Sequence, residues 1–315
     1  MNYSKKGVRA KQKTLNSKSQ KWGRKIALTC VKVMLAAVVG IGICGVAAGI
    51  GVFRGILSST PTIRLSDVVA VGEATIVYDR EGNEIDQYVS TNSNRLSVGM
   101  DEIPDYLGKA FVAIEDERFY QHNGIDIKGI IRAGYQFFKT GGEEAQGAST
   151  ITQQLLKNTV FTDWTSEGNN KIKKIKRKIQ EQYLALEITK YYSKDEILLR
   201  YMNAINLGQN TLGVESASLR YFGKHCSELT ISECAVIASI TQNPSKYNPI
   251  RHPEENVKRR EKCLNKMLAL SVRHNTMKPW RIPMPCTSVL VCTTLTIRKP
   301  TPLPVPTSLM RYMSR

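Results

Sequence analysis

The chain has 315 residues, enough for one sizeable domain with additional segments, and its formal net charge at pH 7 is +18. Such a charge is typical of nucleic-acid-binding proteins, but here it is concentrated at the two ends. Residues 1–32 contain ten Lys or Arg residues and residues 271–315 contain seven, and neither segment has an acid. The stretch between them holds 28 basic and 27 acidic residues, so its near-neutral charge argues against nucleic acid as a partner.

The first predicted element is a membrane anchor at residues 33–53, preceded by a basic cytoplasmic tail at residues 1–32. Its sequence, VMLAAVVGIGICGVAAGIGVF, has 21 residues without a charge, which is long enough to cross a bilayer as a helix. Ten positive charges precede it and only Arg54 and Arg64 follow closely. The positive-inside rule therefore places the N-terminus inside and everything after about residue 55 outside the cytoplasmic membrane. The uncharged stretch is too long for a typical signal peptide, so we expect an uncleaved single-pass anchor.

A linker at residues 54–73 is followed by a predicted β-hairpin. Residues 74–89, ATIVYDREGNEIDQYV, alternate around the turn signal Glu81-Gly82-Asn83. From about residue 104 to residue 270 the pattern is helical. The seven cysteines form no CxxC pair and no metal-ligand spacing, so we assign neither a disulfide nor a zinc site.

A dense group of functional side chains occupies residues 109–124, KAFVAIEDERFYQHNG. Read as one helix, this stretch places Phe111, Glu115 and Phe119 on one face. Aromatic neighbours would partly desolvate the Glu115 carboxylate and favour its neutral form, which suits a general base near neutral pH. An ordinary surface acid on an amphipathic helix is the alternative. The string E-D-x-x-F-x-x-H-x-G is completed by Asp116, His122 and Gly124.

The second string is GASTITQQLLKN at residues 147–158. Ser149 is the expected N-cap of a helix. Beyond it, uncharged amides and one lysine share part of a helical face, which suits the hydroxyls and amides of a sugar with one anionic group. A capped amphipathic helix without a site is the alternative. The candidate substrate contacts here are Ser149, Thr150, Gln153, Gln154, Lys157 and Asn158.

Residues 171–190, KIKKIKRKIQEQYLALEITK, predict a strongly basic helix. By itself such a charge run is usually a solvated face. However, Arg177 and Glu181 form an i, i+4 pair, and the adjoining cations, Lys173 and Lys178 among them, should keep the Glu181 carboxylate ionised. One carboxylate favoured neutral and one held charged would be suited to divided catalytic roles. An apolar stripe that should pack on a core is formed by Ile172, Ile175, Ile179 and Leu186.

Together these strings resemble the motifs of the peptidoglycan glycosyltransferases, the family 51 enzymes of bacterial cell-wall synthesis. G-x-S-T-I-T-Q-Q at residues 147–154 is the most specific match, and R-K-x-x-E at 177–181 resembles the third motif. KDEILLRYMNAINLG at 194–208 resembles the fourth, in which we interpret Tyr201 as a packing residue. Thr241 stands where the family tends to have proline, and the segment RREKCLNKM fits the fifth motif more loosely.

The resemblance covers roughly residues 75–268, within an expected catalytic domain at residues 74–270. It implies a mainly α, lysozyme-like fold at the outer face of the membrane, with a lipid-linked glycan chain as donor and lipid II as acceptor. Glu115 would be the general base on the acceptor's 4-hydroxyl, with inversion at the donor and loss of undecaprenyl diphosphate. Glu181 would assist at the diphosphate. No cofactor is expected to be required, although Glu181 could orient a divalent cation, Mg or Mn. Further substrate contacts would be Asp116, Phe119, His122, Lys173, Arg177 and Lys178.

A membrane-anchored muramidase and an inactive cell-wall scaffold are the alternatives. Other cell-wall synthesis proteins are further candidate partners. A diphosphate already leaves well and needs cations, whereas a glycosidase needs a carboxylic acid to protonate its leaving sugar, so the basic helix favours transfer. Residues 271–315 hold seven of the twelve prolines and show no helical periodicity, which predicts a disordered or aberrant tail. The S-x-x-K string of a penicillin-binding transpeptidase domain does not occur in the chain. We therefore expect a monofunctional form or, as the abrupt change of composition favours, a truncated bifunctional protein.

Overall fold

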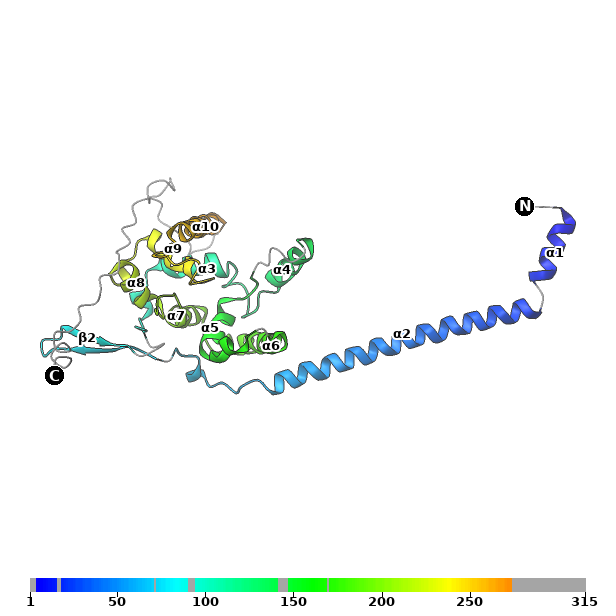
Figure 1. Cartoon of the computed structure of the whole chain (residues 1–315), viewed down its shortest axis with the longest axis horizontal. Coiled ribbons are helices and arrows are strands. Elements are labelled where there is room, and N and C mark those ends of the chain that lie inside the picture. Colours follow the sequence, from blue (N-terminus) through cyan, green and yellow to red (C-terminus); the bar gives the residue numbers. More distant parts are fainter. Residues whose placement is uncertain are drawn as a thin grey trace, which may run out of the picture. The chain divides into compact units, whose positions relative to one another are not determined.

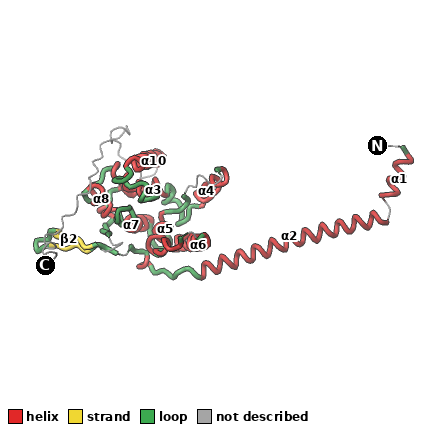
Figure 2. The backbone as a smooth tube through the Cα atoms, in the orientation of Figure 1, coloured by secondary structure: helices red, strands yellow, loops and turns green. Residues whose placement is uncertain are grey.

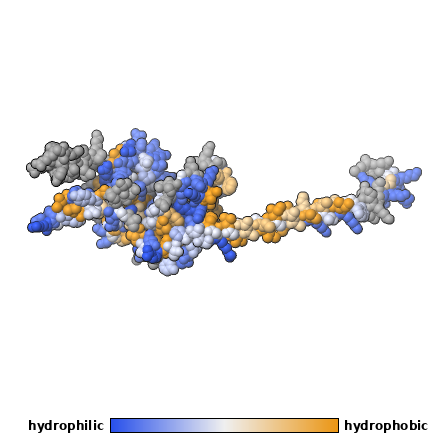
Figure 3. Space-filling view, turned by 60° about the horizontal axis from the view of Figure 1, so that its bottom comes forward, coloured by the Kyte–Doolittle hydropathy of each residue, from blue (hydrophilic) through white to orange (hydrophobic). Residues whose placement is uncertain are grey.

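The structure, a computed structural model, falls into two compact units, residues 1–60 and 61–315, which we describe separately. The first unit contains the helices α1 (Lys5–Leu15) and α2 (Lys18–Ser58) (Figures 1 and 2). Within α2, residues 22–58 contain an 18-residue window with a mean hydropathy of 2.5 and are long and apolar enough to cross a membrane. Apolar side chains follow α2 along its length in the space-filling view of Figure 3. The predicted anchor lies within this helix. The residues that the structure describes are 4–15, 18–70, 72–89, 94–140, 147–168 and 170–273.

The second unit begins with the predicted hairpin. Strands β1 (Thr75–Tyr78) and β2 (Glu84–Tyr88) pair antiparallel, with Thr75 opposite Tyr88. In the turn between them Gly82 has a φ of +85°, which glycine adopts readily. The Asp79 carboxylate fixes the turn by accepting from the backbone N–H of Asn83 at 2.7 Å. The hairpin prediction is confirmed.

The rest of the described unit is helical up to residue 273, as the sequence predicts. α3 packs against α9 and α10, α9 packs against α10, and α5 packs against both α6 and α7 (Figure 1). The short helix α9 is buried along most of its length, so it forms the centre of the α3, α9 and α10 group. The mainly α fold class, with a small hairpin and one N-terminal apolar helix, is confirmed. The α-helices are α3 (Asp105–Glu115), α4 (Ile127–Lys139), α5 (Ile151–Thr159), α6 (Lys171–Ile188), α7 (Lys194–Ala204), α8 (Val214–Phe222), α9 (Ile231–Ile240) and α10 (Pro253–Arg273). Single 3₁₀ turns lie at η1 (Leu65–Asp67), η2 (Met100–Glu102), η3 (Thr162–Glu167) and η4 (Cys226–Glu228).

Two helices begin with capping boxes that the sequence encodes locally. In α7, the Ser193 hydroxyl accepts from the N–H of Glu196 at 3.2 Å, and the Glu196 carboxylate accepts from the N–H of Ser193 at 2.8 Å. Thr230 and Glu233 make the same reciprocal pair at the start of α9. These caps satisfy backbone donors that a helix leaves unpaired at its first turn, so they fix where α7 and α9 begin.

The stripe expected to bury α6 is wrong, because Leu186 is 41% exposed and Ile179 is only partly buried. Ile172 is 79% exposed and Ile175 is 59% exposed. α6 packs on α5 through its C-terminal half, where Leu184, Ala185 and Ile188 are buried. The N-terminal half extends beyond that contact, so its apolar residues lie on the surface among lysines.

Helix α4 also has an exposed apolar face. Ile127, Ile131, Tyr135 and Phe138 recur at helical spacing, and Phe138 is 86% exposed. Within α4 Gly129 alone is buried. Contiguous exposed apolar groups of this kind are typical of binding surfaces or membrane contacts.

Three cysteines in the second unit, Cys226, Cys234 and Cys263, are free and buried. Burial raises the pKa of Cys263 to about 12, so it is a core thiol at neutral pH. The predicted tail lies outside the described residues from residue 274 onward.

Candidate active site

A cavity of about 690 Å³ opens where α3 ends and α5 begins, with α6 on one side and α10 on another. We call it the main cavity. Side chains far apart in the sequence meet in it, since its lining extends from Ile114 to Lys266. The predicted site residues that line it are Glu115, Asp116, Ser149, Thr150, Gln153, Gln154, Lys157, Arg177, Lys178 and Glu181.

Glu115 is the last residue of α3, and its carboxylate is held by three donors. Oxygen Oε1 accepts from the Thr241 hydroxyl at 2.6 Å and from Nη2 of Arg259 at 3.0 Å. Oxygen Oε2 accepts from Nε2 of Gln154 at 3.0 Å. The side chain is only 12% exposed, so these donors replace most of its water.

The expected aromatic surroundings of Glu115 are only half correct: Phe111 lies one turn earlier on α3, but the helix ends at Glu115. Asp116 already has an extended φ of −153°, so Phe119 does not follow one helical turn later. Phe119 instead packs edge-on against the rings of Tyr120 and His122. The carboxylate of Glu115 therefore meets three polar donors.

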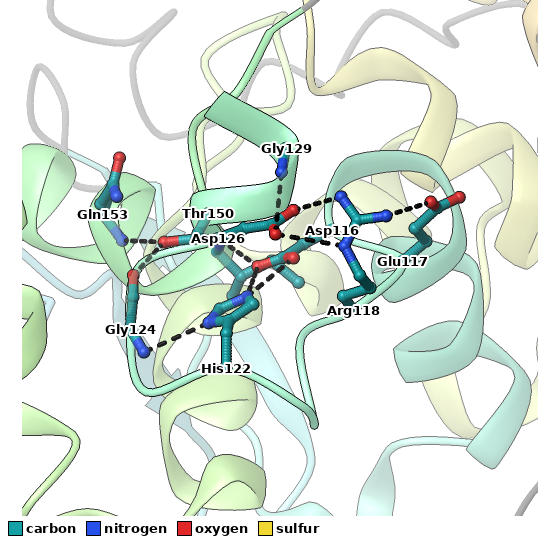
Figure 4. A network of polar contacts seen from close by, with 10 residues as sticks. Asp116, Glu117, Arg118, His122, Gly124, Asp126, Gly129, Thr150 and Gln153 are labelled. Carbon is teal, nitrogen blue, oxygen red and sulfur yellow. Dashed lines mark hydrogen bonds and ion pairs between the residues drawn. The ribbon is translucent and has the colours of Figure 1, made fainter. Parts of the chain in front are cut away.

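Asp116 and His122 connect the end of α3 to the beginning of α5 (Figure 4). The Asp116 carboxylate contacts Nε2 of His122 at 2.9 and 3.0 Å and accepts from the N–H of Ile151, the first residue of α5, at 3.0 Å. The Asp116 side chain is 2% exposed and that of His122 is 9% exposed. These two side chains hold the loop in place; a direct contact with substrate stays a prediction.

Gly124 and Thr150 complete this connection. Gly124 has a φ of +91°, and a Cβ placed on it would lie 2.3 Å from the carbonyl oxygen of Ala185, so only glycine fits. Thr150, not Ser149, is the N-cap of α5: its hydroxyl accepts from the N–H of Gln153 at 3.2 Å and donates to the Gly124 carbonyl at 2.7 Å. Ser149 lies one residue before this N-cap, and its hydroxyl instead accepts a hydrogen bond from Lys178 of α6.

Figure 4 also shows an ion-pair network on the α4 side of the main cavity that we did not predict. Arg118 contacts Asp126 at 3.1 and 2.5 Å and Glu117 at 2.7 Å. Asp126 is the N-cap of α4 and accepts from the N–H of Gly129 at 3.0 Å. Burial opposes ionisation of Asp126, but these hydrogen bonds lower its pKa.

Glu181 is 1% exposed and is paired on both oxygens. Arg177 donates to Oε1, and Nζ of Lys178 lies 2.9 Å from Oε2, which confirms the predicted i, i+4 pair. Lys178 also donates to the Ser149 hydroxyl at 2.8 Å, and Arg177 donates to Glu167 at 2.9 Å. Although burial opposes it, the bonds to Glu167 and Glu181 raise the pKa of Arg177. The basic helix and the start of α5 thus form one charged wall.

The remaining predicted cations are divided between two cavities. Lys157 lines the main cavity with its ammonium 3.7 Å from the Trp164 ring centroid, and burial lowers its pKa. Lys173 lines a smaller cavity of about 390 Å³ that also contains Trp164 and Lys176. Arg177 lines both cavities, whereas Glu181 lines the main cavity and Lys173 the smaller one. Lys173, which was expected to help keep Glu181 ionised, therefore does not share a cavity with it. Asn158 lines neither of these cavities.

Several site residues escaped sequence reasoning. Arg259 and Thr241 lie 144 and 126 residues from Glu115, so no spacing pattern connects them. Tyr201, interpreted as packing, is fully buried, but its hydroxyl also donates to Oε1 of Gln154 at 3.1 Å. Burial raises the pKa of Tyr201 well above its ordinary value, so this hydroxyl stays protonated.

Gln153 is fully buried beside the main cavity, and within the described part of the chain neither atom of its amide has a hydrogen-bond partner. Unpaired buried amides are costly, so this side chain is suited to bind a ligand that enters the cavity. Its predicted role in substrate binding is consistent with that placement and stays a prediction.

The surroundings of Glu181 do not resemble a metal site. Its oxygens face the cations Arg177 and Lys178, whereas hard divalent cations take several oxygen ligands. Across the residues that the structure describes, no three His, Cys, Asp or Glu side chains form a group that could hold a metal ion. The suggested role of Glu181 in orienting a divalent cation therefore has no supporting ligand set.

Comparison with known protein families and sequences gives consistent matches. The family model described as Transglycosylase matches residues 81–268. Penicillin-binding protein 1A of Clostridium botulinum (strain Langeland) is 42% identical over 234 residues, which is 72% of this chain and 27% of that protein. Penicillin-binding protein 1A of Clostridium perfringens (strain 13) is 41% identical over 240 residues, 73% of this chain and 34% of that protein.

Two further matches cover a similar share of the chain. Penicillin-binding protein 1F of Bacillus subtilis (strain 168) is 40% identical over 191 residues, 61% of this chain and 25% of that protein. A crystal structure of penicillin-binding protein 1A from Haemophilus influenzae matches at 22% identity with a TM-score of 0.31, covering 64% of this chain and 19% of that one. The chain thus spans about a quarter to a third of the length of the curated relatives it matches.

Proposed function

Because this chain belongs to the Transglycosylase family, that is, the family 51 peptidoglycan glycosyltransferases, we propose that it polymerises lipid II into glycan strands. The donor would be a lipid-linked glycan chain and the acceptor lipid II, with inversion at the donor sugar and release of undecaprenyl diphosphate. The observation that carries the proposal is the placement of a hydrogen-bonded carboxylate, Glu115, in the same cavity as the cations Lys157, Arg177 and Lys178.

In this reaction Glu115 is the general base. Its three donors hold the carboxylate in place, and a carboxylate must be unprotonated to accept the proton of the acceptor's 4-hydroxyl. As that proton moves to Glu115, the hydroxyl oxygen forms a bond to the anomeric carbon of the donor. The bond from that carbon to the diphosphate oxygen breaks, and its electron pair leaves with the diphosphate.

The charged wall of α6 supports the leaving-group step. A departing diphosphate develops negative charge, which fixed cations stabilise without any proton donor. The Lys157 ammonium lies over the Trp164 ring rather than against a carboxylate, and the Lys178 side chain is 38% exposed. Both ammonium groups can therefore be directed at a bound anion. Glu181 then acts by holding Arg177 and Lys178 in position.

The alternative of a muramidase is less well supported by the same contacts. A glycosidase needs a carboxylic acid that protonates the leaving sugar oxygen. Both oxygens of Glu181 are in ion pairs with cations, so it has no free oxygen from which to present a proton.

Membrane attachment suits a substrate with a polyprenyl tail. α2 is long enough to span the bilayer, and the charge bias predicts an N-terminus in the cytoplasm and a catalytic domain outside. The exposed apolar face of α4 gives the catalytic unit a second surface suited to the membrane interface.

The test is a direct assay of the full-length chain in detergent with labelled lipid II. Formation of a polymer that lysozyme digests, together with release of undecaprenyl diphosphate, is the expected outcome. A parallel sample receives purified lipid-free glycan strands. Cleavage of those strands without any polymer from lipid II would replace the transferase with the muramidase, and inactivity in both samples would support the scaffold.

A further inference from the structure

The contact of Thr241 with Glu115 is the observation from which we start. Thr241 is the C-cap of α9 and lines the main cavity. Its hydroxyl oxygen lies 2.6 Å from Oε1 of Glu115 and 2.9 Å from the carbonyl oxygen of Ala238. A hydroxyl has a single proton to donate, and a carboxylate is a stronger acceptor than a neutral carbonyl. The proton of Thr241 is therefore directed at Glu115.

The two oxygens of Glu115 are consequently unequal. Oε1 accepts hydrogen bonds from the Thr241 hydroxyl and from Nη2 of Arg259. The Arg259 guanidinium is itself fixed, because it donates to the Ser239 carbonyl at 3.1 Å and to the Gln242 side chain at 2.6 Å. A carboxylate oxygen has two lone-pair sites, so two donors fill Oε1. Within the described residues Oε2 receives one donor, from Gln154, and keeps one site free.

We propose that Thr241 is a positioning residue for the base: with Arg259 it fills Oε1 of Glu115, so that Oε2 is the atom that takes the proton from the acceptor hydroxyl. The assignment rests on the proposed function. Without the Thr241 hydroxyl, Oε1 would have a free site, the carboxylate could rotate, and either oxygen could meet the acceptor. Thr241 thereby fixes the orientation of the base.

Two buried groups near Glu115 stay neutral in the pH range of interest. Burial raises the pKa of Tyr201 well above its ordinary value and that of Cys263 to about 12, so both are neutral between about pH 5 and 8. Arginine remains charged throughout. A shift of the acidic limb of a pH–rate profile in this range therefore does not come from Tyr201, Cys263 or Arg259. The groups that face Glu115 are Arg259, Lys262, Lys266 and Cys263 on α10, Tyr201 on α7, Lys157 on α5, and its chain neighbours Asp116 and Glu117.

The decisive variant is Thr241→Val, which has the same shape but lacks the hydroxyl. Loss of one donor to a charged acceptor should move the acidic limb of the polymerisation pH–rate profile upward by about one pH unit. Thr241→Ser retains the hydroxyl and should restore the wild-type profile. Thr189→Val is the matched control, because Thr189 is also a helix C-cap whose hydroxyl bonds a backbone carbonyl, that of Ala185 at 2.6 Å.

A readout that does not depend on turnover separates this inference from the proposed function. The ¹³C chemical shift of the Glu115 side-chain carboxyl, assigned by its absence in Glu115→Gln, can be followed against pH in the detergent-solubilised full chain. Its midpoint should rise in Thr241→Val and remain at the wild-type position in Thr241→Ser and Thr189→Val. This titration is informative even if lipid II is not polymerised.

The outcomes are distinct. A raised midpoint and a raised acidic limb in Thr241→Val alone support the inference. An unchanged midpoint in folded Thr241→Val overturns it, whatever the activity. Equal shifts in Thr241→Val and Thr189→Val would also overturn it, because they would show a general effect of losing a helix-cap hydroxyl. A midpoint that rises in Thr241→Val alone, together with wild-type protein that makes no polymer, would overturn the proposed function and leave the Thr241 contact supported.

Discussion

Replacing Tyr201 with Phe removes one oxygen atom and tests whether the buried hydroxyl orients the catalytic site. In the native chain this hydroxyl donates to Oε1 of Gln154 at 3.1 Å, and Nε2 of Gln154 donates to Glu115 at 3.0 Å. Without it, the Gln154 carbonyl loses its partner and the amide can turn that oxygen toward the Glu115 carboxylate. The base would then face an acceptor in place of a donor.

The expected magnitudes follow from these contacts. An unsatisfied buried polar group costs about 1–3 kcal/mol, so the free energy of unfolding should fall by roughly that amount. The hydrogen bond between Tyr201 and Gln154 joins two neutral groups and contributes about 0.5–1.5 kcal/mol. Loss of the orientation that this bond gives the Gln154 donor should therefore lower kcat by about two- to tenfold. Substrate affinity should change less, because Tyr201 does not line the main cavity.

Tyr221→Phe is the matched control. Tyr221 is as fully buried as Tyr201, and its hydroxyl donates to the Leu207 carbonyl at 2.7 Å, away from Glu115. Both variants should lose stability in denaturant unfolding, but only Tyr201→Phe should lose kcat in lipid II polymerisation. Equal losses of kcat in the two variants, or full kcat in Tyr201→Phe, would refute the reasoning and return Tyr201 to a packing role.

Three further predictions concern charged side chains. Glu115→Gln should lower polymerisation by a factor of about 10² to 10⁴ while lipid II binding persists, and near-normal polymer yield would exclude Glu115 as the base. Arg177→Gln should reduce lipid II turnover by about ten- to a hundredfold, whereas Lys173→Gln, in the smaller cavity, should mainly raise KM for the donor; equal kcat losses would contradict the division between cavities. Burial lowers the pKa of Lys194 to about 8, below the value of about 10.5 expected in the unfolded chain, so the unfolded state binds more protons between these values and wild-type stability rises with pH across them. The free energies of unfolding of Lys194→Met and wild type, measured with denaturant, should therefore become more similar as the pH rises from 8 to 10.5. A difference that stays constant over this range would contradict the predicted direction.

The sequence predicted those parts of the molecule that depend on short spacings. The hairpin followed from its alternation and turn residues, and the ion pair of Arg177 with Glu181 followed from one helical turn. Failures came where a helix ended or where its neighbours decided exposure. α3 stops at Glu115, which removes Phe119 from the predicted face, and Ile172 is exposed because α5 covers only the far half of α6.

The donors to Glu115 could not have been predicted from spacing. Arg259 and Thr241 reach it from α10 and the end of α9 through packing of α3 against both helices. Such contacts depend on tertiary arrangement, since the intervening chain of more than a hundred residues has no periodicity that relates them. A departure from the family pattern at Thr241 was the one available signal, and it marked a difference without indicating its partner.

The bond between the Asp116 carboxylate and the N–H of Ile151 has a consequence for motion in the site. It fastens the residue after Glu115 to the first residue of α5, and Gln154 follows three positions later on the same helix. Glu115 and its amide donor Gln154 are therefore connected by a short, buried path that includes this hydrogen bond. When the cavity changes shape around its substrate, Glu115 and Gln154 should move together. Hydrogen exchange should report this directly, with the Ile151 amide among the slowest in the chain to exchange.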